Sequence, residues 1–137
     1  MVRTQRRVLL VDDEPSIIKV VGKGLEAAGY EVLTALNGRD GLMKAQLGRL
    51  DVIVLDLMMP QMSGFEICAA LKRDPNCRHI PVIIFTGKGQ DMDEKLCREL
   101  GAAAYISKPN TSKALVELIE ALLGALPPPT GPAGLAA

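Results

Sequence analysis

Four short apolar runs are the feature that most restricts how this chain can fold. They occupy residues 8–11 (VLLV), 52–55 (VIVL), 82–85 (VIIF) and 103–106 (AAYI). A strand is apolar along its whole length when both faces of its sheet are covered, which is typical of parallel sheets. Segments with helical periodicity separate the runs. The sequence therefore predicts an α/β domain in which helices cover both faces of one parallel sheet.

The composition narrows the class of protein. The chain has 137 residues, 48% of them hydrophobic and 23% charged, as expected of a single globular domain. The charges of sixteen basic and sixteen acidic residues cancel, so the net charge does not favour binding to nucleic acid or to an anionic membrane. Aromatic residues are only 3%, too few for a surface on which nucleic-acid bases could stack. No apolar run approaches the ~20 residues of a membrane span, and the first run is too short for a signal peptide. We expect a soluble, cytoplasmic protein.

Periodicity and helix-breaking residues predict five strands that alternate with five helices. The expected strands cover residues 7–12, 31–35, 51–56, 81–86 and 103–107. The expected helices cover residues 15–28, 39–47, 65–72, 90–100 and 112–123. We expect right-handed crossovers and the flavodoxin-like strand order 2-1-3-4-5, which together make a three-layer (βα)5 domain. We expect residues 1–6 to be a leader, residues 7–124 the domain, and residues 125–137 a Pro/Gly-rich flexible tail.

Carboxylates follow two of the apolar runs. Asp12 and Asp13 come directly after the first run, and Asp56 follows the second. In strand order 2-1-3-4-5 the first and third strands are neighbours, so the three acids should converge at the carboxyl end of the sheet. Two carboxylates at ~4 Å repel by about 4 kcal/mol at an effective dielectric near 20, so a shared cation or a proton is needed. A few carboxylates with waters are the usual ligands of Mg²⁺.

Two further polar residues are expected at the same end of the sheet. Thr86 closes the third apolar run, and Lys108 lies just past the fourth. A hydroxyl can donate a hydrogen bond to a phosphoryl oxygen, and an ammonium can place a point charge beside one. Together with the acids, these residues indicate a site for a divalent cation and a phosphoryl group.

The chain resembles the receiver domain of the response-regulator family of two-component signalling, in its single-domain, chemotaxis-regulator-like form. The matching segments are residues 8–15 (VLLVDDEP), 56–64 (DLMMPQMSG), 83–87 (IIFTG) and 101–109 (GAAAYISKP). Their order and spacing together are specific. With the intervening helices the resemblance covers residues 7–123, nearly the whole chain.

The resemblance implies a role for each acid. Asp56 would accept a phosphoryl group from a sensor histidine kinase or a histidine phosphotransfer protein. Asp13 and Asp56 would bind Mg²⁺ through their carboxylates, and Asp12 would help through water. The backbone carbonyl of Met58 would complete the protein ligands of the metal.

The resemblance also implies how the signal leaves the site. Thr86 and Lys108 would contact the phosphoryl group, and Tyr105 would be the switch aromatic that turns inward when Thr86 moves. The peptide bond between Lys108 and Pro109 would be cis. A downstream effector would bind the face made by the fourth helix, fifth strand and fifth helix. Such a domain promotes its own phosphorylation and dephosphorylation but turns over no separate substrate.

Simpler interpretations of these residues stay open at this point. Asp13 could cap the helix that begins near Pro15, and Tyr105 could be a static strand residue. One rival function is a Mg²⁺-dependent phosphatase with an aspartyl-phosphate intermediate, but such enzymes commonly place a second acid where this chain has Met58. Another rival is a flavin carrier, but residues 12–14 (DDE) would repel a flavin phosphate.

The remaining sulfur and imidazole side chains are expected to be structural. His79 should face solvent in a loop. The three cysteines have no metal-ligand spacing and should be free thiols: Cys68, Cys77 and Cys97. Cys68 and Cys97 fall on expected helices and should be buried or half-buried. Three methionines could form a soft surface for a partner or fill the space beneath the irregular loop, and we expect the second: Met58, Met59 and Met62.

Overall fold

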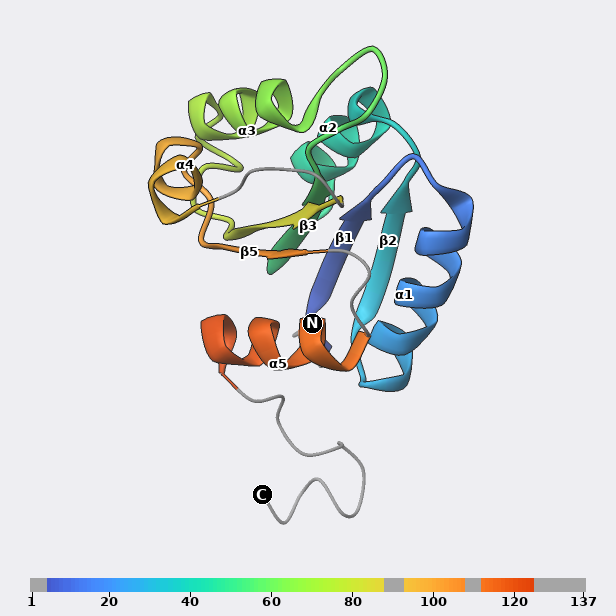
Figure 1. The fold of residues 1–137 in the computed structure, drawn as a ribbon. Coiled ribbons are helices and arrows are strands. Elements are labelled where there is room, and N and C mark those ends of the chain that lie inside the picture. The colour runs from blue at the N-terminus through green and yellow to red at the C-terminus, as the bar shows by residue number, and fades with distance from the viewer. Residues whose placement is uncertain (1–4, 88–92, 108–111, 125–137) are drawn as a thin grey trace.

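The computed structural model describes residues 5–87, 93–107 and 112–124, and Thr86 through its main chain only. The elements are β1 (Arg7–Val11), α1 (Pro15–Ala27), β2 (Glu31–Ala35), α2 (Gly38–Leu47), β3 (Val52–Asp56), α3 (Gly64–Arg73), β4 (Val82–Thr86), α4 (Glu94–Glu99), β5 (Ala104–Ser107) and α5 (Ser112–Leu123). The strands form one parallel sheet in the order β2-β1-β3-β4-β5. This confirms the predicted fold class and strand order (Figure 1). Within the described residues, no helix is long and apolar enough to cross a membrane.

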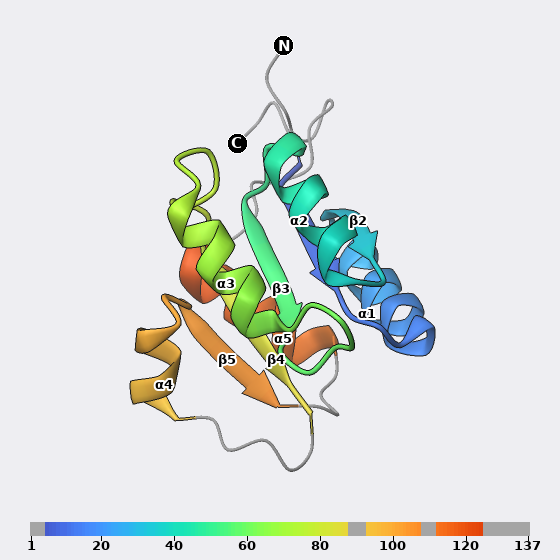
Figure 2. The ribbon, with the colours of Figure 1, turned by 90° about the horizontal axis from the view of Figure 1, so that it is seen from above.

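Two apolar cores lie on the two faces of the sheet. Helices α1 and α5 cover one face, and α2, α3 and α4 lie over the other (Figures 1 and 2). Successive strand residues point to opposite faces, so Val8 and Leu10 pack in the core with α1 and α5, whereas Leu9 and Val11 pack in the core with α2 and α3. All four side chains are at most 1% exposed, which explains the unbroken apolar runs.

Helix ends follow from local sequence signals. Pro15 opens α1, where its missing N–H costs nothing, and Gly29 follows the helix with a φ of 102°, a left-handed conformation that favours glycine. Helix α3 begins with a capping box, in which the Ser63 side chain accepts from the Glu66 amide and Glu66 accepts from the Ser63 amide. Pro15 and the Ser63 capping box set the lengths of two loops at the carboxyl end of the sheet, whereas Gly29 ends α1 at the opposite end.

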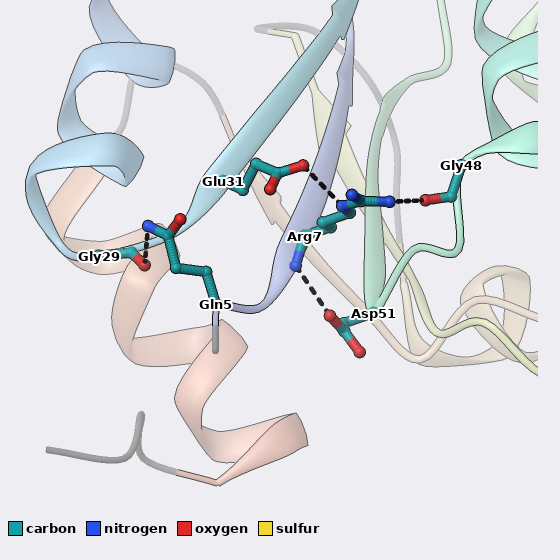
Figure 3. Close-up of polar contacts among 6 residues, drawn as sticks. All are labelled: Gln5, Arg7, Gly29, Glu31, Gly48 and Asp51. Atoms are coloured by element: carbon teal, nitrogen blue, oxygen red, sulfur yellow. Dashed lines mark hydrogen bonds and ion pairs between the residues drawn. The ribbon is translucent and has the colours of Figure 1, made fainter. Parts of the chain in front are cut away.

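Arg7 joins three segments at the amino-terminal edge of the sheet (Figure 3). Its Nε lies 2.6 Å from a Glu31 carboxylate oxygen at the start of β2, and its Nη1 donates to the Gly48 carbonyl at 2.8 Å. Its backbone amide donates to Asp51 Oδ2 at 2.8 Å, just before β3. One residue therefore ties the starts of β1, β2 and β3 together.

One main-chain group on β2, at the outer edge of the sheet, is bonded by a side chain of α2. The Ala35 carbonyl accepts from the Asp12 amide, so it faces β1. Because main-chain groups alternate in direction along a strand, the preceding Thr34 carbonyl faces outward. Lys44 of α2 donates from Nζ to that carbonyl at 2.5 Å and pairs with Asp40 at 3.2 Å. An ammonium group therefore occupies part of the exposed edge.

Most element boundaries lie within one residue of the sequence-based expectation, but the start of one helix and the direction of one side chain differ from it. The helix expected from residue 90 to residue 100 begins only at Glu94, because Asp93 is its N-cap and accepts from the Leu96 amide at 2.8 Å. Residues 90–92 lie outside the described residues. Met58 was expected beneath the loop but is 59% exposed, whereas Met59 is buried and Met62 packs against the core.

The sulfur and imidazole side chains otherwise behave as expected. All three cysteines are free and buried. Burial raises the pKa of the Cys68 thiol to about 11, so this thiol stays protonated at neutral pH. His79 is exposed.

Candidate functional site: an acid cluster at the carboxyl end of the sheet

The strand register brings acids from distant parts of the sequence to one place. Val11 at the end of β1 pairs with Leu55 of β3, so the next residue on each strand is an aspartate: Asp12 and Asp56. The chain reverses its strand order at this β1–β3 pair, because β2 lies beside β1 and β4 lies beside β3. Ligands of open parallel sheets bind at this kind of position.

The three acids form a compact cluster. Asp12, Asp13 and Asp56 each place a carboxylate oxygen within 4.8 Å of the others. Asp12 is 0% exposed and Asp56 is 3% exposed, whereas Asp13 is partly exposed at the mouth of the site. The sequence-based prediction that these acids converge is therefore met in the structure. The arrangement concentrates negative charge where little water can screen it.

The two buried acids are oriented by the same local motif. Asp12 Oδ1 accepts from the Glu14 amide at 2.9 Å, and Asp56 Oδ1 accepts from the Met58 amide at 3.1 Å. In both, a carboxylate binds the main-chain N–H two residues further along, which is an Asx turn. The sequence-based reasoning did not include these two amides. An acid that ends a strand just before a loop is the signal that could have found them.

Asp13 does not act as a helix cap. The N-cap position of α1 is Glu14, which makes no side-chain capping hydrogen bond, and the first turn of α1 contains no acid. The simpler interpretation of Asp13 as a cap is therefore wrong. Its carboxylate lies in the acid cluster instead.

The other predicted site residues are described only in part. Thr86 is the last residue of β4, in register with Ser107 of β5. Tyr105 lies on β5 and is 37% exposed. Lys108, Pro109 and the peptide bond between them lie outside the described residues.

The ligand atoms of the acid cluster are suited to a divalent cation. All three groups are carboxylates, the ligand type that Mg²⁺ prefers. Oxygens around octahedral Mg²⁺ are about 3 Å apart when adjacent and about 4.2 Å apart when opposite, so carboxylate oxygens within 4.8 Å would move inward, or bind in part through water, to hold the ion. Bound Mg²⁺ would supply positive charge against the carboxylates and an incoming phosphoryl group.

Comparison with known proteins identifies the family. A family model for the response regulator receiver domain matches residues 8–120. The chain belongs to this family. The receiver domain is 38% identical over 119 residues to the polar-differentiation response regulator DivK of Brucella anthropi, which covers 87% of the chain and 97% of DivK. Protein PilH of Pseudomonas aeruginosa is also 38% identical, over 85% of the chain and 97% of PilH.

Longer relatives match in one part only. The transcriptional regulatory protein PhoP of Bacillus subtilis, which regulates alkaline phosphatase synthesis, is 36% identical over 118 residues. The match covers 86% of the chain and 48% of PhoP. The chain thus spans about half the length of this relative.

Solved structures of receiver domains are similar throughout the fold. The chemotaxis response regulator CheY4 of Vibrio cholerae has a TM-score of 0.80 at 35% identity, over 87% of the chain and 99% of CheY4. The receiver domain of the sensor histidine kinase PA1611 from Pseudomonas aeruginosa has a TM-score of 0.79 at 26% identity, over 88% and 98%. That structure carries a magnesium ion coordinated in its active-site cleft. Family membership makes signalling the chief role of the domain and disfavours the phosphatase alternative.

Proposed function

We propose that the receiver domain is a phosphorylation-operated switch in which Asp56 is the phospho-acceptor. The observation that carries this proposal is the cluster of carboxylate oxygens from Asp12, Asp13 and Asp56 within 4.8 Å, at the ends of neighbouring strands. The three carboxylates, with the Met58 carbonyl, would hold Mg²⁺ and so offset their mutual repulsion.

The reaction is a phosphoryl transfer between two side chains. A carboxylate oxygen of Asp56 attacks the phosphorus of a phosphohistidine on a sensor histidine kinase or a histidine phosphotransfer protein. The P–N bond breaks, its electron pair returns to the imidazole, which takes up a proton, and Asp56 becomes an acyl phosphate. The Met58 amide, 3.1 Å from Asp56 Oδ1, orients the carboxylate for this attack.

The new charge would act on Thr86 and Lys108, which contact the phosphoryl group, and through Thr86 on Tyr105. Tyr105 lines a cavity of about 340 Å³ between α4 and β5. An exposed aromatic side chain that lines such a cavity supports the proposed role of Tyr105 as a switch. The face of α4, β5 and α5 would then bind a downstream effector in one state better than in the other.

The setting of the switch follows from the same proposal. The effector would be a separate protein or another segment of a longer polypeptide, as the half-length match to PhoP allows. The kinase and the receiver domain would meet in the cytoplasm. The domain would act only on its own Asp56 and would not turn over a separate substrate.

Intact mass after treatment with acetyl phosphate and Mg²⁺ tests the acceptor. We expect a gain of one phosphoryl group in the wild type and none in Asp56→Asn or in EDTA. Asp13→Ala should require at least about tenfold more Mg²⁺ for the same uptake, because it removes one charged ligand. If Asp56→Asn takes up a phosphoryl group at the wild-type rate, the proposal that Asp56 is the acceptor is wrong. Steady release of phosphate from a phosphate monoester would support the phosphatase instead.

A further inference from the structure

Gly64, the first residue of α3, lies directly on the main chain of the acceptor strand. Its amide donates to the Leu57 carbonyl at 2.9 Å and closes the loop of residues 57–63. A Cβ at Gly64 would lie 2.5 Å from Leu57 Cα and 2.6 Å from the Asp56 carbonyl oxygen. Both atoms belong to the backbone, so no side-chain rotation can relieve the contact.

The backbone conformation does not require glycine here. The positive φ angles of the described residues do not include Gly64. In a helical position Ala is favoured over Gly by about 1 kcal/mol, so local propensity would select against this residue. The close approach to Asp56 and Leu57 is the feature of the structure that demands a missing side chain.

The same main chain orients the acceptor carboxylate. Asp56 Oδ1 accepts from the Met58 amide, which follows Leu57 in the chain. A methyl group on Gly64 must push Leu57 away by about 0.9 Å to restore an ordinary contact of 3.4 Å. That movement would shift both the Asp56 backbone and the amide that holds its carboxylate. A misplacement of about 1 Å can cost roughly 10²-fold in rate.

We propose that Gly64 is a positioning residue for phosphoryl transfer: it lets α3 fix the end of β3 so that the Asp56 carboxylate points into the acid cluster. The inference rests on the proposed role of Asp56 as acceptor. Gly64 itself touches neither the metal nor the phosphoryl donor. It acts through the main chain of Asp56 and Leu57.

The first test compares two glycine variants. Gly64→Ala should lower the limiting rate of phosphoryl uptake, at saturating Mg²⁺ and acetyl phosphate, by roughly tenfold to a hundredfold. Gly48→Ala is the matched control, because its Cβ would lie 2.7 Å from the Lys44 carbonyl oxygen, at the opposite end of the sheet. It should cost stability but leave the limiting rate within about twofold of wild type. Far-UV circular dichroism verifies that each variant is folded.

A second measurement uses the wild type and does not depend on the folding of a variant. Because coupling is reciprocal, Mg²⁺ that orders Asp56 should also slow hydrogen exchange at the Gly64 amide. The control is the Gly41 amide, which donates to the Asn37 carbonyl at 3.0 Å in the first turn of α2. We expect Mg²⁺ to slow exchange at Gly64 several-fold more than at Gly41.

The outcomes separate this inference from the proposed function. If the wild type takes up no phosphoryl group, the role of Asp56 as acceptor fails. If the wild type is phosphorylated and a folded Gly64→Ala reaches the same limiting rate, the positioning role is wrong. Unchanged exchange at Gly64, in protein whose Asp12 and Asp13 amide resonances show saturation by Mg²⁺, would overturn it as well.

Discussion

Two glycines of α1, Gly22 and Gly24, differ in how much space lies beside them. Adding one methyl group at each should therefore change the stability of the fold in opposite directions. Gly22 is buried, yet a Cβ there would have no heavy atom within 4 Å. At Gly24 a Cβ would lie 1.9 Å from Ser112 Oγ and 2.2 Å from Ser112 Cβ, at the start of α5. Neither glycine has a positive φ, so the backbone accepts Ala at both positions and only the packing differs.

The expected magnitudes follow from these contacts. Gly22→Ala should stabilise the fold by about 0.5–1 kcal/mol, the usual difference between Ala and Gly inside a helix. Gly24→Ala gains the same propensity but must move the start of α5 by about 1.2 Å to restore a contact of 3.4 Å. Overpacking of this kind costs about 1–3 kcal/mol, so we expect a net loss of about 1 kcal/mol.

Urea unfolding followed by far-UV circular dichroism measures both variants. They should differ by about 2 kcal/mol in free energy of unfolding, or roughly 6 °C in Tm. Ser112→Gly in the Gly24→Ala background removes both crowded atoms and leaves Ser112 Cα at 3.7 Å, so it should recover part of the loss. The packing argument would be refuted by a Gly24→Ala variant as stable as Gly22→Ala, or by a Gly22→Ala variant less stable than wild type.

Two other side chains give independent predictions. The Tyr30 hydroxyl is buried without a hydrogen-bond partner in the part of the chain that the structure describes, so Tyr30→Phe should stabilise the fold by about 1 kcal/mol. Burial, with a smaller contribution from Glu120, raises the pKa of Tyr30 above its ordinary 10.0. Because the folded state then holds the hydroxyl proton more tightly than the unfolded state does, the free energy of unfolding should fall as pH rises above 10. In urea titrations at alkaline pH, Tyr30→Phe should make the free energy of unfolding less dependent on pH. An unchanged pH dependence would show that Tyr30 does not cause the fall. Arg7→Met should lower the free energy of unfolding by about 1 kcal/mol, because the partly exposed polar contacts of Nη1 and Nε are lost. Arg39 makes no polar contact with the described residues, so Arg39→Met is the control and should leave stability unchanged. Equal stabilities of the two variants would show that the Arg7 contacts contribute nothing.

The sheet and the acid cluster could be predicted because one physical signal determines both. A strand covered on two faces must be apolar throughout, so the polar residue that ends each run marks the end of the strand. Once β1 and β3 are neighbours, Asp12 and Asp56 must lie side by side. The alternation of strands and helices predicted a parallel sheet, and the flavodoxin-like strand order expected for it placed β1 beside β3.

Other features depend on contacts that no periodic pattern records. The start of α4 is set by Asp93, whose side chain accepts a hydrogen bond from the Leu96 amide and so caps the helix. Met58 is exposed in a loop that is closed by the hydrogen bond from the Gly64 amide to the Leu57 carbonyl. The sequence displays the glycine, but only the structure places it against the main chain.

The bond from Lys44 to the Thr34 carbonyl has a consequence for how copies of this protein meet in solution. A second sheet cannot add to β2 along its full length unless it displaces an ammonium group from its acceptor and removes that charge from water. Replacing Lys44 would leave the Thr34 carbonyl without its ammonium donor and remove a charge from this edge. Lys44 thus makes the pairing of a second strand with β2 less favourable.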